Sequence, residues 1–357
     1  MSLENLVASM ASRMPWDVGQ TVLGAAEVTK GHGWDRTVAK FKGVEGTPAQ
    51  REALTESLRQ HLLCGEKNVR MYEVAPDELE KLRQAASALK PAKTPFSTLY
   101  PALMMEPELG AAFPQPLAVA AVEATDDGLA VVFASGRAIK LREPVDRSTL
   151  PEEAAKALAG YDEVLGVKLQ RLEAVDVVWI PSHGSYVDVR VDFPKGMHQD
   201  NANAVHERVT EALAALIGFQ PLVSPVNLFP VIDRLYRKSK EGSVVELAFG
   251  TTTASLKHEK MRRAGTCLRE EKYHLGGKDA LGTPIEPYRL SVQWSVPVGP
   301  EKASRPELSL HGSSKLGLSD APVLDHAVIR HCVGLADFNF VRDRIEAALA
   351  KAEAKAA

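Results

Sequence analysis

The sequence predicts a mixed α+β fold, in which a helical N-terminal domain precedes a larger domain with a mainly antiparallel sheet covered by helices. Apolar residues recur at helical spacing in the first ninety residues, whereas strand-like alternation and hairpin turns begin after Pro116. A proline-rich stretch separates the two patterns. We therefore predict a helical domain at 1–90, a proline-punctuated connector at 91–115 and an α+β domain at 116–357, with a sub-boundary near 220–230.

The clearest N-terminal helix begins after Thr47, which forms a capping box with Gln50. Leucines at every fourth position from Leu54 to Leu62 give this helix an apolar stripe, and Gly65 is placed to end it. Further helices are expected around 16–28, 34–41 and 76–89, with a short strand at 68–74.

The larger domain shows alternation typical of strands. A turn at 125–128 joins the first two strands as a hairpin. Between Val187 and Phe193, apolar residues alternate with Asp188, Arg190 and Asp192, which predicts one buried and one solvent-exposed face. Strands are expected at 117–123, 129–134, 137–141, 174–180, 185–193, 244–249, 288–296 and 307–310, and helices at 151–158, 200–217, 231–238 and from 337 onward. The helix at 200–217 has an apolar stripe that fits the buried face of this sheet.

The composition is that of an ordinary globular protein, with 45% hydrophobic and 25% charged residues among 357. A net charge of −3 disfavours a protein that coats nucleic acid or membranes over its whole surface. The cysteines Cys64, Cys267 and Cys332 form no spaced pair, so we expect reduced thiols and a cytoplasmic location. No signal peptide and no membrane-spanning run is recognised, so no membrane partner is expected.

Motif searches disfavour the enzyme classes that carry a readable signature. The nearest approach to a phosphate-binding loop is Gly276-Gly277-Lys278, which Asp279 follows in place of Ser or Thr. Nucleophile-elbow, kinase, zinc-protease and deaminase motifs are also absent from the sequence. We therefore expect no catalytic residue and no cofactor, although an enzyme with dispersed active residues stays open.

The candidate active residues of such a dispersed-site enzyme are a histidine- and acid-rich group between His183 and Glu207. Imidazoles and carboxylates ligate divalent metals, so the group could serve a metal-dependent hydrolase or nuclease. The separation of His198 and His206 does not suit a shared site, and Asp188 and Asp192 share a strand face with Arg190, which indicates cross-strand charge pairing instead. We predict no metal ligand among the group's members, His183, Asp188, Asp192, His198, Asp200, His206 and Glu207.

The stretch 231–278 is basic, with eleven Lys or Arg against six Asp or Glu, a local charge of +5. Tyrosines and histidines are interleaved with these charges, a combination that neutralises phosphates and stacks on bases. Residues 255–263 are expected to form a loop or a short helix. The alternative is a solvated face whose charges pair internally. The candidate nucleic-acid-binding residues are Arg237, Lys238, Lys257, Lys260, Arg262, Arg263 and Arg269.

The leading functional hypothesis is a non-enzymatic binding or adaptor protein whose partner is nucleic acid or another protein. The metal-dependent hydrolase or nuclease is the first alternative. A structural subunit of a protein assembly, contacting its neighbours through the helical N-terminal domain, is the second. The sequence makes no prediction of the oligomeric state.

Overall fold

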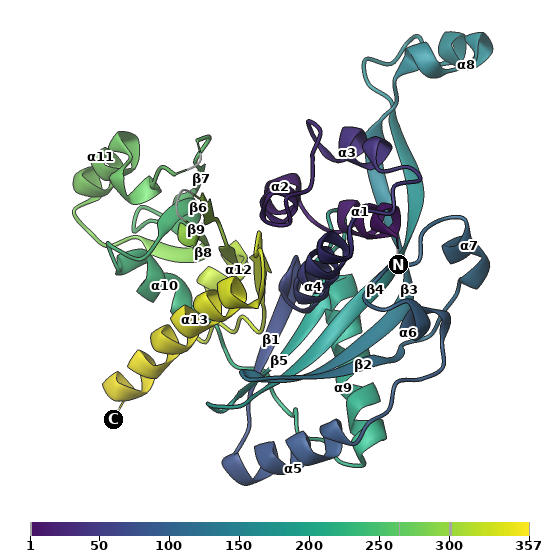
Figure 1. The fold of residues 1–357 in the computed structure, drawn as a ribbon. Helices are drawn as coiled ribbons and strands as arrows, with labels where there is room; N and C mark the ends of the chain where they lie inside the picture. The colour runs from purple at the N-terminus through teal and green to yellow at the C-terminus, as the bar shows by residue number, and fades with distance from the viewer. Residues whose placement is uncertain (1, 264, 300–301, 357) are drawn as a thin grey trace.

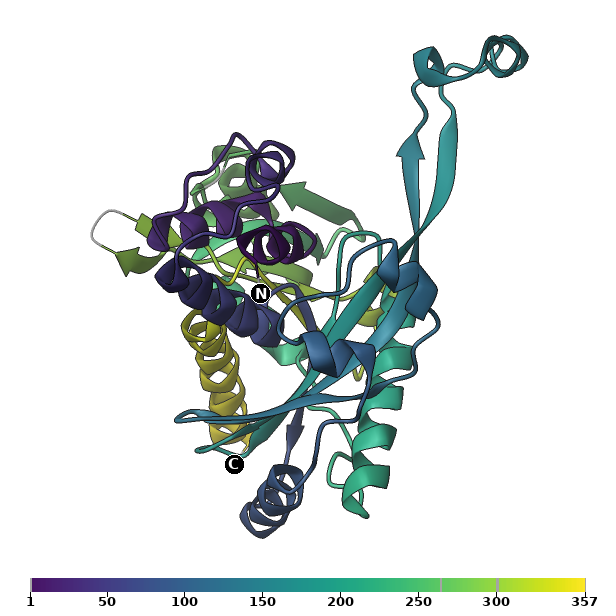
Figure 2. The same ribbon diagram turned by 45° about the vertical axis from the view of Figure 1, so that its right-hand side comes forward.

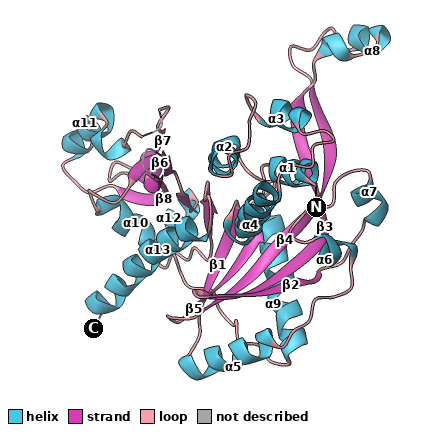
Figure 3. Ribbon diagram, viewed as in Figure 1, coloured by secondary structure: helices cyan, strands magenta, loops and turns pink. Residues whose placement is uncertain are grey.

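The computed structural model describes residues 2–263, 265–299 and 302–356. Its helices and strands confirm the predicted α+β class with a helical N-terminal region (Figures 1 and 3). The helices are α1 (Leu3–Ala11), α2 (Trp16–Ala25), α3 (Trp34–Lys40), α4 (Pro48–Cys64), α5 (Pro76–Ser87), α6 (Pro95–Leu99), α7 (Glu108–Ala112), α8 (Glu152–Ala157), α9 (Gln199–Ile217), α10 (Phe229–Arg237), α11 (Lys272–Leu281), α12 (Ser314–Gly317) and α13 (Leu335–Ala356). No helix in these residues is both long and apolar enough to cross a bilayer.

Ten strands of the described chain form one antiparallel sheet in the order β2-β3-β4-β5-β1-β12-β11-β8-β6-β7. The short strands β9 and β10 pair separately. The strands are β1 (Lys67–Glu73), β2 (Ala118–Thr125), β3 (Gly128–Pro144), β4 (Leu165–Pro181), β5 (Tyr186–Asp192), β6 (Ser243–Gly250), β7 (Leu256–Lys260), β8 (Glu286–Gln293), β9 (Val296–Gly299), β10 (Lys302–Ser304), β11 (Glu307–His311) and β12 (Ala327–Arg330).

The sheet connects chain segments that lie far apart in sequence. Strand β1 comes from the first ninety residues, yet it pairs with β5 on one side and with β12 on the other. The segment between α9 and α10 also returns to β1, because the Val226 N–H donates to the Met71 carbonyl at 2.8 Å. The connector 91–115 contains α6 and α7, and Phe96 of α6 is buried in the core.

Helices cover both faces of the half of the sheet that contains β5. Helices α5 and α9 lie below β2–β5 in Figure 1, and Val205, Val209 and Leu213 of α9 pack on the valines of β5. Helices α1, α4 and α13 contribute to the core on the opposite face. The predicted strand and helix therefore share one apolar core, as their spacing indicates.

The prediction of a solvent-exposed face for β5 is wrong. Asp188, Arg190 and Asp192 are all buried, because α4 and α13 cover the face that the alternation left polar. The Arg190 guanidinium bonds Asp188 at 2.9 Å and lies 3.9 Å from the centre of the Phe338 ring. Asp188 also forms an ion pair with Arg342 of α13, at 3.2 Å. Charge pairing within the fold thus replaces hydration on this face.

Two predicted boundaries also differ from the structure. Residues 255–263, expected as a loop or a short helix, contain the strand β7, which pairs with β6. The strands expected at 129–134 and 137–141 are one continuous strand, β3, whose partner β4 begins nine residues earlier than predicted. Together, β3 and β4 extend beyond the body as a two-stranded arm with α8 at its far end (Figure 2).

Candidate functional site

The seven candidate basic residues lie at the edge of the sheet around β7 and on the nearby end of α10. Arg237 pairs with Asp233 at 2.7 Å, and Lys238 pairs with Glu241. Lys260 lies 3.3 Å from Glu246 on the neighbouring strand. Lys257, Arg262 and Arg263 are exposed. The structure therefore brings these residues to one region but engages part of their charge internally.

Arg269 has a structural role. Its guanidinium donates to the carbonyls of Glu241 at 2.7 Å and Gly242 at 2.5 Å, and also to the carbonyl of Lys238. A guanidinium that donates several bonds to backbone oxygens fixes the connection between α10 and β6. Because its N–H donors already bond these carbonyls, Arg269 stabilises the fold and is not a ligand-binding residue of the basic surface.

Two lysines that were not among the candidates complete a cavity of about 520 Å³ between β6, β7 and α11. We call it the lysine pocket, and its cationic side chains are Lys257, Lys272 and Lys278. Tyr273, at the mouth, is 79% exposed. Threonine and serine hydroxyls from the β6–β7 turn line another part of the wall, namely those of Thr251, Thr253 and Ser255.

A buried hydrogen-bond chain fixes the inner wall of this pocket. His274 bonds Glu259 of β7 through Nδ1 at 2.6 Å and the Tyr236 hydroxyl of α10 through Nε2 at 2.9 Å. Gly276 and Gly277 follow on α11, and a Cβ at either position would meet no atom within 4 Å, so this wall stays open. The hydrogen-bond chain anchors α11 to the sheet and holds its lysines beside Lys257.

The histidine- and acid-rich group, weighed as metal ligands only in the alternative of a metal-dependent enzyme, is spread over the molecule. Asp188 and Asp192 lie on the face of β5 that α4 and α13 cover, whereas His206 of α9 bonds the Asn68 amide oxygen at 2.8 Å on the opposite face. Burial lowers the pKa of His206 well below its ordinary value, so this imidazole is neutral. His183 lies in the β4–β5 turn and His198 precedes α9. Among the described residues, no cluster of three or more His, Cys, Asp or Glu side chains is arranged to hold a metal ion.

The sequence did not indicate a cavity of about 1040 Å³ that lies at the base of the arm. We call it the arm cleft. Leucine, isoleucine and methionine side chains form much of its wall, Leu103, Leu109, Met104, Met105, Ile139, Leu141, Leu169 and Leu172. Its charged lining is mainly cationic, with Arg13, Lys168, Arg171, Lys195 and Arg330 against Glu66, Glu106 and Glu173, and His331 beside them.

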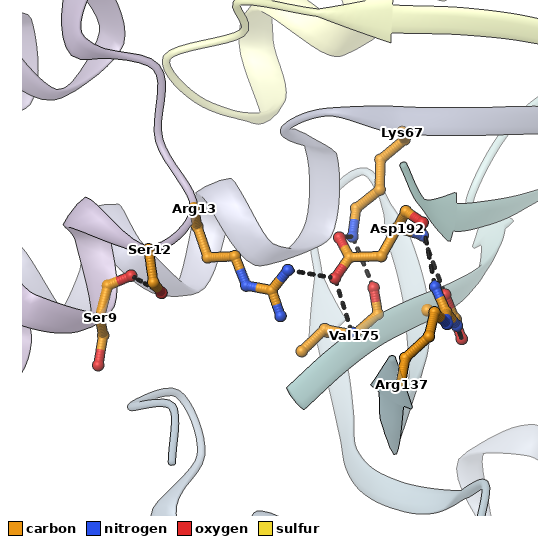
Figure 4. A network of polar contacts seen from close by, with 8 residues as sticks. Ser9, Ser12, Arg13, Lys67, Arg137, Val175 and Asp192 are labelled. Carbon is orange, nitrogen blue, oxygen red and sulfur yellow. Dashed lines mark hydrogen bonds and ion pairs between the residues drawn. The ribbon is translucent and has the colours of Figure 1, made fainter. Parts of the chain in front are cut away.

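A buried ion network lies behind the cleft (Figure 4). Asp192 is bound by Arg13 at 3.1 Å and by Lys67 at 2.9 Å, and it also accepts the Val175 N–H at 2.9 Å. Burial opposes ionisation of Asp192, but the two cations and the N–H lower its pKa to about 2. Arg137 contacts the carbonyl of Asp192 at 3.0 Å. This network holds the α1–α2 turn on the ends of β1 and β5.

Two residues of the cleft have a strained backbone. Glu66 and His331 have φ values of 48° and 58°, in the left-handed region that costs a side chain about 1 kcal/mol or more. The His331 N–H bonds Glu66 at 3.0 Å, and its imidazole bonds Asp17 at 2.9 Å. The hydrogen bond to Asp17 outweighs burial and raises the pKa of His331. An imidazole oriented by a carboxylate can exchange a proton with a bound ligand.

Glu173 adds to the cleft a carboxyl that titrates near neutrality. Burial raises its pKa to about 7, although its carboxylate accepts the Met104 N–H at 2.7 Å. The charged lining of the cleft comes from chain segments around residues 13, 66, 106, 170, 195 and 330. No spacing within the sequence links such distant segments, so periodicity and motif patterns carry no signal of the cleft.

None of the protein-family models, curated proteins or solved structures compared with this chain matches it. The lysine pocket and the arm cleft are therefore the features from which a function can be inferred. Cavities of this size that combine convergent charged groups with exposed aromatic or apolar wall are common ligand sites.

Proposed function

We propose that this protein is a non-enzymatic binding protein that contacts single-stranded nucleic acid through the lysine pocket and the exposed arginines of the following loop. The observation that carries the proposal is the convergence of Lys257, Lys272 and Lys278 on one cavity with Tyr273 exposed at its mouth. Lysines neutralise backbone phosphates, and an exposed aromatic ring stacks on bases without sequence preference.

The geometry favours a single strand over a duplex. A pocket of about 520 Å³ can take an unstacked base, and the Ser255 hydroxyl in its lining can donate to a phosphate oxygen. Arg262 and Arg263 are exposed beyond the end of β7, so they extend the cationic surface past the pocket. Arg237, Lys238 and Lys260 contribute less to phosphate binding, because each already pairs with a carboxylate of the protein.

Salt dependence tests the phosphate contacts. Wild type should retain labelled single-stranded DNA and RNA at low salt, and affinity should fall steeply as salt rises. The triple variant Lys257→Ala/Lys272→Ala/Lys278→Ala should bind more weakly for every sequence, with a salt slope flatter by about 0.7 for each phosphate that is no longer neutralised. The same charge removed at three exposed lysines around α5, in Lys81→Ala/Lys90→Ala/Lys93→Ala, should leave the slope unchanged.

Stacking has a different signature from phosphate neutralisation. Tyr273→Ala should weaken binding by about 1–3 kcal/mol while the salt slope stays that of wild type. Equal binding by the pocket triple variant and the α5 triple variant would contradict the proposal. So would the absence of retention by wild type at low salt.

A further inference from the structure

The arm is stabilised by fewer strand partners than the rest of the sheet. In the described chain, β2 pairs with β3 only as far as Ala134, and β5 pairs with β4 only at 177–179. The outer parts, 137–144 of β3 and 165–172 of β4, pair with each other alone. Figures 1 and 2 show this ribbon projecting from the body. A free two-stranded ribbon with open edges is marginally stable in water and invites further pairing.

The arm also exposes a regular apolar stripe. Leu165, Val167 and Leu169 alternate along β4 and are 57%, 63% and 55% exposed. Because alternate residues of a strand share a face, these three side chains form one continuous stripe. Leu169 belongs to the wall of the arm cleft, so the stripe leads from the tip of the arm into the cleft. A contiguous stripe of this kind marks an interface.

The two ends of the arm carry opposite charge. The tip, residues 145–164, has five acidic and two basic side chains, a net charge of −3. The arm cleft at the base has five Arg or Lys against three Glu in its lining. Tyr161, exposed at the tip, adds an aromatic ring that suits the leucine and methionine wall of the cleft. The tip of one arm is thus complementary in charge and polarity to the base of another.

We propose that the arm is a dimerisation device, in which two copies of this chain lay their arms side by side in opposite directions and each acidic tip enters the partner's arm cleft. A two-fold axis through the middle of two antiparallel arms brings each tip to the other's base, whatever the arm's length. The same surface is then used on both copies, as an isologous interface requires. The arms pack face to face, so that each covers the apolar stripe of the other.

Apolar disruption is the first test. The wild-type chain should sediment as a dimer in equilibrium ultracentrifugation, and Val167→Asp/Leu169→Asp should raise the dimer dissociation constant by about tenfold or more. The control Val223→Asp/Leu318→Asp places the same charges on apolar residues that are still more exposed and lie outside the arm, so it should dimerise as wild type does. A monomeric wild type, or a dimer that tolerates the arm variant, would overturn the proposal.

Charge exchange distinguishes a weakened interface from a damaged arm. Glu153→Lys/Glu163→Lys makes the tip basic, and Arg171→Glu/Lys195→Glu makes the cleft more acidic; all four residues are exposed. Each double variant should dimerise more weakly than wild type, by about tenfold or more. The quadruple variant combines a basic tip with an acidic cleft and should regain the wild-type dissociation constant. Failure of the quadruple variant to recover, with both double variants folded, would refute the pairing of tip and cleft.

Discussion

Glu173 makes stability depend on pH in a way that one isosteric change can isolate. Glu173 is 2% exposed in the wall of the arm cleft, and burial raises its pKa from 4.5 to about 7. Below about pH 4.5 the carboxyl is protonated in both the folded and the unfolded state, so it adds no pH dependence. Between about pH 4.5 and 7 the folded state keeps a proton that the unfolded state has released. Stability therefore falls as pH rises through this window.

The magnitude follows from the shift. A pKa raised from 4.5 to about 7 corresponds to a penalty of about 3 kcal/mol in the free energy of unfolding once the pH exceeds 7. Glu173→Gln removes the ionisation and keeps an oxygen that can accept the Met104 N–H. The variant should match wild type near pH 4 and exceed its stability at pH 8 by up to about 3 kcal/mol.

Urea unfolding followed by tryptophan fluorescence at pH 4 and pH 8 measures this difference directly. The difference between variant and wild type cancels the contribution of every other titrating group. Glu211→Gln, at an exposed glutamate of α9 outside the arm, should leave the unfolding midpoint unchanged at both pH values. If Glu173→Gln gives no greater advantage at pH 8 than at pH 4, the buried carboxyl is not the group that we describe.

Three further predictions concern the scaffold. Leu213→Asp should unfold the protein, seen as loss of the thermal transition by circular dichroism, because an unpaired charge in the α9 core costs several kcal/mol. Arg269→Ala should lower the free energy of unfolding by about 2 kcal/mol, since several part-buried carbonyls lose a charged donor, and chemical denaturation measures this loss. Asp192→Asn should cost about 3 kcal/mol at pH 7 by leaving Lys67 and Arg13 unpaired. The Asp192 pKa is depressed, so its stabilisation is lost as pH falls from about 4 through 2; an acid titration should show a shallower decline in the variant.

Local patterns determined much of the fold. The capping box at Thr47 and Gln50 forms as expected at the start of α4, because both bonds lie within one turn of the chain. The hairpin between β2 and β3 and the stripe of α9 are equally local, and they appear where the sequence placed them. The basic character of 231–278 was also visible, since net charge needs only composition.

Tertiary structure decided how those elements and charges are used. The alternation in β5 identifies a polar face but not what covers it, and α13 buries that face with Arg342, which lies 154 residues beyond Asp188. Lys260 of β7 forms an ion pair with Glu246 because the register of the two neighbouring strands places Glu246 of β6 directly opposite it. The arm cleft joins Arg13, Glu173 and Arg330, whose spacing follows no period. Helical and strand periods report interactions within a few residues, whereas burial, ion pairing and cavities depend on which distant surfaces meet.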